Sequence, residues 1–168
     1  MNNWVLEPFP HFVIDNFLSE VDFKALKDEL NSTNNCLQTK FDTPLEEKII
    51  YKNKNLKRES NKIIKIMGSN KIKNIINEQI EISEIKSLVE TKDFSGYSPY
   101  HVTKDNGSLG SHVDHSYIED GKYRHIANTI FFASDKWEDG WGGETILFSS
   151  NGLKQIVSIK PFPNRLIL

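Results

Sequence analysis

The sequence predicts an α+β fold in which a jelly roll stands behind N-terminal helices. In the first half of the 168 residues, apolar side chains recur at helical spacing. After Asp93 this periodicity stops, and glycine, aromatic and β-branched residues become frequent. Short apolar runs then follow at regular spacing, separated by turn residues, which is typical of a sandwich or barrel. Because no repeat or linker interrupts the chain, we expect one domain, helical over about 1–92 and jelly-roll over about 93–168.

The composition is that of an ordinary globular protein, and the formal net charge is −2. This charge creates no overall field that would attract nucleic acid or a membrane surface. No apolar run approaches the roughly 18 residues of a membrane span, and the N-terminus lacks the features of a signal peptide. The single Cys36 cannot form an internal disulfide, which fits a reducing compartment. We therefore expect a cytoplasmic protein whose partners include neither nucleic acid nor membrane.

The N-terminal segment predicts a strand, a turn and a helix in that order. Residues 9–18 are apolar and β-branched enough for a short strand that ends in a turn. Ser19 is placed as an N-cap, with Asp22 at the third helical position as an imperfect capping box. The helix should run from Ser19 to about Asn31, because three apolar residues fall on one helical face: Phe23, Leu26 and Leu30.

The next segment predicts a loop followed by helices. Residues 31–44 are polar and rich in turn formers, which favours a loop. Residues 44–77 carry isoleucines at helical spacing, with a break at Gly68-Ser69-Asn70. This region is also rich in lysine. With little aromatic interleaving, the lysines indicate a solvated helix face rather than a nucleic-acid interface.

The second half predicts a series of short strands. An Asn106-Gly107 turn should join the first two as a hairpin. The run 124–133 is apolar on both faces and should be a central strand. Residues 117–123 and 137–143 are expected as loops, and 150–152 and 161–163 as turns. The predicted strands are 97–102, 108–114, 124–133, 144–149, 153–159 and 164–168.

The tripeptide His112-Val113-Asp114 lies near the end of the second of these strands. On a strand, residues i and i+2 point to the same face, so the imidazole and the carboxylate would share one space. Such a pair supplies two of the three ligands of the 2-His-1-carboxylate triad, which holds Fe(II) and leaves positions open for substrates and O2. The tripeptide alone is common, so its surroundings decide its meaning.

Those surroundings contain several further motifs in a fixed order, of which the Trp-X-X-X-Trp-Gly-Gly-Glu-Thr block is the most specific. The pieces are Tyr100, Gly107 with Leu109, His112 to Asp114, Asn128 to Phe132, Trp137, Trp141 to Thr145, Leu147-Phe148 and Pro161 to Leu168. Together with the strand and helix at the N-terminus, they resemble the iron(II)- and 2-oxoglutarate-dependent dioxygenases, in the branch similar to prolyl 4-hydroxylases.

The resemblance implies a double-stranded β-helix and a hydroxylation chemistry. Fe(II), 2-oxoglutarate as co-substrate and O2 are the implied cofactors, with ascorbate as a further candidate. Oxidation of an unactivated C–H bond is then coupled to decarboxylation of 2-oxoglutarate to succinate. In this chemistry the metal and the co-substrate carry the reaction, and the protein supplies orientation and a dry pocket.

The resemblance also implies roles for single residues. His112 and Asp114 match two iron ligands and are the catalytic candidates. The co-substrate pocket would be lined by Tyr100, Asn128, Ile130 and Phe132. For Ile130 and Phe132, plain core packing explains the pattern equally well. A turn could redirect His115 toward the metal, whereas we interpret His101 and His125 as structural or surface residues.

One part of the family pattern has no counterpart in residues 1–168. The pattern places a second histidine after the strand 164–168. About ten residues further on, it places an Arg or Lys that pairs with the far carboxylate of 2-oxoglutarate. Arg165 matches a different position. We therefore expect the reading frame to continue past Leu168 with these residues and the last strands of the barrel. We also expect residues 1–168 alone to bind metal weakly and to turn over little.

Three functional hypotheses follow. The first is a dioxygenase that hydroxylates a prolyl or other peptidyl residue, or a small molecule. The alternative is a catalytically incomplete jelly-roll binding module that retains half of the metal site. A cupin-like metalloenzyme with another cofactor is disfavoured by the Trp141 to Thr145 block. Neither the substrate nor the oligomeric state is selected by the sequence.

Overall fold

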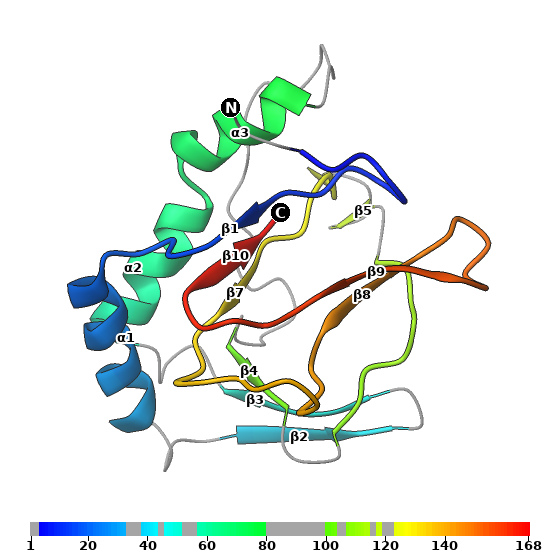
Figure 1. The fold of residues 1–168 in the computed structure, drawn as a ribbon. Helices are drawn as coiled ribbons and strands as arrows, with labels where there is room; N and C mark the ends of the chain where they lie inside the picture. The colour runs from blue at the N-terminus through cyan, green and yellow to red at the C-terminus, as the bar shows by residue number, and fades with distance from the viewer. Residues whose placement is uncertain are drawn as a thin grey trace. The chain divides into compact units, whose positions relative to one another are not determined.

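A computed structural model describes residues 4–32, 38–43, 46–51, 57–79, 100–103, 107–114, 117–118 and 123–168. Within these ranges the chain forms three helices and ten strands (Figure 1), which confirms the α+β class. The strands form two three-stranded and two two-stranded sheets, and every pairing is antiparallel. The pairings among the described strands do not by themselves show a barrel, so the jelly roll stays a prediction.

The chain divides into two compact units, each built from segments that are far apart in the sequence. The first unit contains Met1–Lys27, Asn70–Lys86 and Ala127–Leu168. The second contains Asp28–Ser69 and Ser87–Ile126. Neither unit follows the expected split into a helical and a strand-rich half. The prediction of one domain over 1–168 stays a prediction.

The first unit is organised around β10 (Arg165–Ile167), which lies between β1 (Val13–Ile14) and β7 (Ile130–Phe132) (Figure 1). The prediction of a central strand over 124–133 is therefore wrong in this sheet. β7 covers three residues of that run and lies at the side of β10. The central place goes to β10 because Leu166 is 0% exposed, whereas Ile130 is 39% exposed. Burial, rather than the length of the apolar run, decides which strand is central.

A hairpin of β8 (Thr145–Phe148) and β9 (Gln155–Ile159) completes the strands of this unit. Its inner face carries Leu147 and Ile159, which form a buried cluster with Ile167 of β10. The predicted turn at 150–152 is confirmed, since Gly152 has φ +70° and its N–H donates to the Ser149 carbonyl at 2.7 Å. Glycine tolerates this left-handed conformation without strain.

Asn164 joins the N-terminal strand to the C-terminal one inside the first unit. Its side-chain amide accepts a hydrogen bond from the Leu18 N–H and donates one to the Leu18 carbonyl, both at 2.9 Å. Its backbone N–H donates to the Phe132 carbonyl at 2.9 Å, and its own carbonyl accepts from Phe17 N–H at 2.9 Å. Asn164 is buried and has φ +62°. Its four hydrogen bonds therefore link three segments of the chain, at Phe17-Leu18, at Phe132 and at Asn164 itself, an arrangement called here the Asn164 bracket.

Helix α1 (Glu20–Ser32) begins as predicted. The Asp22 N–H donates to Ser19 Oγ at 3.1 Å, and the Ser19 hydroxyl donates to the Asp22 carboxylate at 2.8 Å. This reciprocal contact satisfies an N–H group that the first helical turn leaves open. Phe23 packs edge-on against Phe131 of β7, with ring centroids 6.2 Å apart, so the start of the helix packs on the sheet of the first unit.

The second unit contains a sheet of β2 (Gln38–Asp42), β3 (Glu47–Tyr51) and β4 (His101–Val102) in that order. The predictions of a loop over 31–44 and a helix from Pro44 are wrong here. Ile49 and Ile50 fit either period, and pairing on both sides of β3 favours the strand. Helices α2 (Arg58–Met67) and α3 (Asn70–Gln79) confirm the helical prediction beyond this point, and the predicted break is found at Gly68 and Ser69, with Asn70 already in α3. α3 belongs to the first unit.

The sequence predicted that residues 97–102 and 108–114 would pair with each other as a hairpin. In the structure, the described residues of both segments pair with β3 instead. Val102 lies opposite Ile49, and Leu109 lies opposite Glu46. The described residues from 101 to 109 thus follow one edge of β3 instead of folding back on each other, which corrects the hairpin prediction. The predicted loop over 117–123 is also wrong in part, because its two ends pair as β5 (Tyr117–Ile118) and β6 (Tyr123–Arg124). Residues 97–99, 104–106 and 119–122 lie outside the described ranges.

Candidate metal half-site

The segment that carries His112 and Asp114 is attached to the first residues of β3. The Glu47 N–H donates to the Ser108 carbonyl at 2.8 Å, and the next residue, Leu109, lies opposite Glu46. From Gly110 to Asp114 the chain has left the sheet. The prediction that the tripeptide lies on a strand is therefore wrong by a few residues, since the strand contact ends at Leu109.

The two candidate ligands nevertheless face each other. His112 Nε2 lies 3.6 Å from Asp114 Oδ1, as their i and i+2 spacing predicts. The side chains are 49% and 45% exposed, so an ion can reach both. Metal–nitrogen and metal–oxygen bonds are each about 2.0–2.2 Å long, and a single ion can therefore bind both atoms at once.

A backbone contact orients the imidazole. His112 Nδ1 lies 2.8 Å from the carbonyl oxygen of Gly110. Because a carbonyl oxygen only accepts, Nδ1 must carry a proton in this contact. In the neutral imidazole, Nε2 then keeps its lone pair, which a metal ion can bind. Metal-binding histidines commonly donate their second N–H to such a carbonyl, which fixes the tautomer and the ring orientation.

The arrangement is chemically a half-site. In the part of the chain that the structure describes, no three His, Cys, Asp or Glu side chains are grouped closely enough to hold an ion. The pair therefore offers one nitrogen and one carboxylate oxygen, a donor set that suits Fe(II) and other divalent transition metals. Of the other histidines considered, His115 lies outside the described residues. His101 is exposed on β4, and His125 is half-buried after β6.

The four predicted pocket residues lie in different units. Tyr100 is half-buried directly before β4, in the second unit with His112 and Asp114. Asn128 is exposed before β7 in the first unit, where Ile130 and Phe132 form the ends of β7. Phe132 packs against the buried cluster of Leu147, Ile159 and Ile167. Phe132 therefore serves core packing, which leaves a role toward the co-substrate open to it, and the assignment of these four residues stays a prediction.

The Trp- and Gly-rich loop at 137–143 is confirmed. Gly140, Gly142 and Gly143 have φ values of +90°, +77° and +84°. The indole N–H of Trp137 donates to the Gly142 carbonyl at 2.7 Å and closes the loop. The Trp-X-X-X-Trp-Gly-Gly block thus encodes a specific backbone path, because residues other than glycine rarely adopt these φ values.

The β2–β3 hairpin, which supports the segment with the half-site, does not follow from the helical spacing of the isoleucines. The signal in the sequence is the adjacent β-branched pair Ile49-Ile50, which suits a strand. The helical spacing of isoleucines further along the chain predicts a helix over the same residues.

Comparison with known proteins supports the chemistry that the half-site suggests. Residues 96–168 match the family model described as the 2OG-Fe(II) oxygenase superfamily. The match covers less than half of the chain, and what it supports is a similarity to oxygenases that use Fe(II), 2-oxoglutarate and O2. A search of curated proteins found no match. A search of solved structures also found none. Among the helices of the described residues, none has the length and apolar character needed to cross a membrane.

Proposed function

We propose that the protein is a non-haem Fe(II)- and 2-oxoglutarate-dependent dioxygenase that hydroxylates a peptidyl residue or a small molecule. The observation that carries this proposal is the His112–Asp114 pair. Its donor atoms lie 3.6 Å apart, inside the region that matches the oxygenase family. The finer assignments, namely the branch similar to prolyl 4-hydroxylases and a cytoplasmic location, belong to the same proposal.

In this function His112 and Asp114 hold the metal and leave its remaining positions open. The Gly110 carbonyl keeps the proton on Nδ1 of His112, so Nε2 is available as a ligand. The Asp114 carboxylate contributes one negative charge that offsets part of the charge of a divalent ion. The bound Fe(II) and 2-oxoglutarate would supply the oxidising chemistry, whereas the protein orients the reactants.

Four residues are proposed to serve the co-substrate, in keeping with the family resemblance. In the second unit Tyr100 offers a hydroxyl, and in the first unit Asn128 offers an amide; both groups can donate hydrogen bonds to a carboxylate. Ile130, also in the first unit, is 39% exposed and offers an apolar surface. Phe132 would act through packing, because it contacts the buried cluster on the inner face of the β8–β9 hairpin.

The direct test is metal binding by single-residue variants. Mn²⁺ serves as a redox-stable probe of an Fe(II) site, and its paramagnetism broadens the NMR signals of nearby nuclei. In the wild-type protein we expect Mn²⁺ to broaden the His112 ring signals first. His112→Ala and Asp114→Ala should each abolish saturable binding, because each leaves one ligand. His101→Ala is the matched control, since it removes an exposed imidazole from β4 in the same unit. Equal Mn²⁺ affinity in the wild type and in both ligand variants would remove the metal assignment.

Activity is measured on the protein as it is naturally encoded, because residues 1–168 alone are expected to turn over little. The readout is succinate formed from 2-oxoglutarate in the presence of Fe(II), O2 and ascorbate. Succinate that disappears in His112→Ala but persists in His101→Ala supports the dioxygenase. The second candidate is a binding module, favoured by the observation that only two ligands are grouped within the described ranges. Saturable Mn²⁺ and 2-oxoglutarate binding without succinate formation would favour that module.

A further inference from the structure

The β2–β3 hairpin is closed by Thr43. The Thr43 N–H donates to the Glu46 carbonyl at 2.9 Å, and the Glu46 N–H donates back to Thr43. This return bond is 3.1 Å to the hydroxyl oxygen and 3.3 Å to the carbonyl oxygen. Of the two Thr43 oxygens, the hydroxyl oxygen therefore lies closer to the Glu46 nitrogen. Threonine and serine commonly close turns in this way.

The residues that follow the closure hold the segment with the metal half-site. Glu47 N–H donates to the Ser108 carbonyl at 2.8 Å, and Leu109 pairs with Glu46 across the same edge. The next residue, Gly110, accepts the 2.8 Å contact from His112 Nδ1. A series of short contacts therefore runs from Thr43 through the start of β3 to the imidazole. All of these residues belong to the second unit.

The attachment point is also restrained by side chains. Lys48 Nζ lies 2.8 Å from the Glu46 carboxylate, and the two side chains are only 19% and 21% exposed. On the other side of β3, Glu47 lies opposite Asp42 of β2. The first residues of β3 are therefore held on both edges of the strand. A support of this kind is needed because His112 and Asp114 lie beyond the last strand contact and cannot orient themselves through a sheet.

We propose that the β2–β3 hairpin sets the geometry of the metal half-site and that Thr43 is a positioning residue for it. This inference rests on the proposed function, because it concerns the same pair of ligands. Its physical basis is the short path from Ser108 to His112. A shift of Ser108 moves the Gly110 carbonyl, and with it the ring that this carbonyl orients. Groups that orient metal ligands influence affinity although they never touch the ion.

The test compares two hydroxyl-closed hairpins of the same protein. Thr43→Val removes the hydroxyl with little change of shape and should weaken Mn²⁺ binding by about tenfold, the lower end for the loss of a ligand-supporting contact. Thr43→Ser keeps the hydroxyl and should restore wild-type affinity. Ser149→Ala is the matched control. Ser149 Oγ accepts from the Lys154 N–H at 3.1 Å in the β8–β9 turn, and that turn belongs to the first unit. It should leave Mn²⁺ affinity unchanged.

A second measurement needs no variant. If the hairpin orients the half-site, coupling is reciprocal, and Mn²⁺ binding must stabilise the hairpin in return. The diamagnetic ion Zn²⁺ replaces Mn²⁺ here, so that NMR signals persist. Saturating Zn²⁺ should slow hydrogen exchange of the Glu47 amide, whereas the Lys154 amide should exchange at its former rate.

The outcomes separate this inference from the proposed function. Two results would overturn the positioning role but not the metal site. One is an unchanged Mn²⁺ affinity in a folded Thr43→Val variant, and the other is a Glu47 amide whose hydrogen-exchange rate does not change with Zn²⁺. Absence of metal binding by the wild-type protein overturns the proposed function first. Equal weakening by Thr43→Val and Ser149→Ala would show a general loss of stability and would also overturn the positioning role.

Discussion

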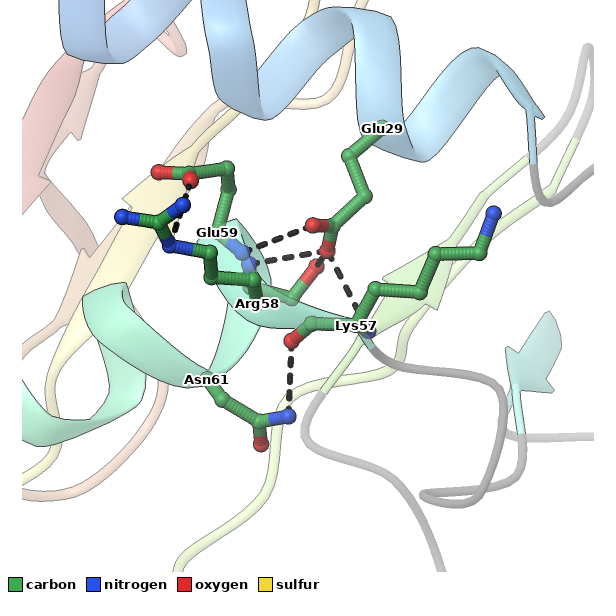
Figure 2. Close-up of polar contacts among 6 residues, drawn as sticks. Glu29, Lys57, Arg58, Glu59 and Asn61 are labelled. Carbon is green, nitrogen blue, oxygen red and sulfur yellow. Dashed lines mark hydrogen bonds and ion pairs between the residues drawn. The ribbon is translucent and has the colours of Figure 1, made fainter.

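The carboxylate of Glu29 accepts two hydrogen bonds from Ser60, one of 2.9 Å from the backbone N–H and one of 2.5 Å from the hydroxyl. The same carboxylate accepts from the N–H groups of Glu59 at 2.6 Å and Lys57 at 3.3 Å (Figure 2). Lys57, which precedes α2, makes no capping bond with its own side chain. Glu29 of α1 therefore caps α2 from 31 residues away, and its charge complements the positive end of the helix dipole.

Replacing this distant cap should destabilise the protein. Glu29→Ala leaves several N–H groups at the start of α2 without an acceptor and should lower the free energy of unfolding by about 1–2 kcal/mol, the usual range for a lost cap. The measurement is urea unfolding followed by circular dichroism. Glu78→Ala is the control, because Glu78 is exposed near the end of α3, and its change should stay within about 0.5 kcal/mol. Equal losses in the two variants would contradict the capping role.

The Glu29 cap should also give stability a pH dependence. Burial of Glu29 works to raise the pKa of its carboxyl, but the hydrogen bonds from Ser60, Glu59 and Lys57 outweigh burial, and the pKa is lowered. The folded state therefore binds this proton less readily than the unfolded state does. The stabilisation is fully present above the unfolded pKa of about 4.3 and is lost as pH falls through the folded pKa. Unfolding curves at a series of acidic pH values should show a smaller acid-induced loss of stability in Glu29→Gln than in the wild type. Identical losses of stability in the two proteins would show that Glu29 is not the source of the pH dependence.

The Asn164 bracket should be costly to remove. Asn164→Ala deletes both bonds to Leu18 and leaves a buried N–H and carbonyl without partners, so we expect a loss of about 2–4 kcal/mol. Asn164→Gly makes the same deletion but tolerates φ +62°, and it should be the less destabilised of the two. Thermal unfolding checks both. Asn74→Ala, at an exposed position of α3, is the control. A loss no larger than that of the control would show that the bracket is dispensable.

The central place of β10 predicts a contrast between two leucines. Leu166 is 0% exposed, so Leu166→Ala should leave a cavity and lower stability by about 2–5 kcal/mol. Leu153 is 85% exposed in the β8–β9 turn, and Leu153→Ala should change stability by less than about 0.5 kcal/mol. Denaturant midpoints measured under one condition compare the two. Similar midpoints for both variants would contradict a core built around β10.

The candidate site shows where sequence reasoning succeeded. The spacing of His112 and Asp114 correctly predicted that their side chains share one space. Residues only two positions apart stay close in an extended segment, even where that segment is not part of a sheet. The carbonyl that orients His112 is also only two residues away. The support of this segment could not be predicted in the same way, because Glu47 and Ser108 meet only through sheet pairing.

Features that depend on neighbours along the chain could be predicted from the amino-acid sequence. These include the Ser19 cap of α1, the break between α2 and α3, the turn at Gly152 and the facing pair of candidate ligands. Three other features became visible only in the fold: the central place of β10, the hairpin within residues 38–51 and the cap that Glu29 provides for α2. Caps and turns are set by hydrogen bonds within a few residues, whereas strand order and distant caps depend on which apolar surfaces are buried together.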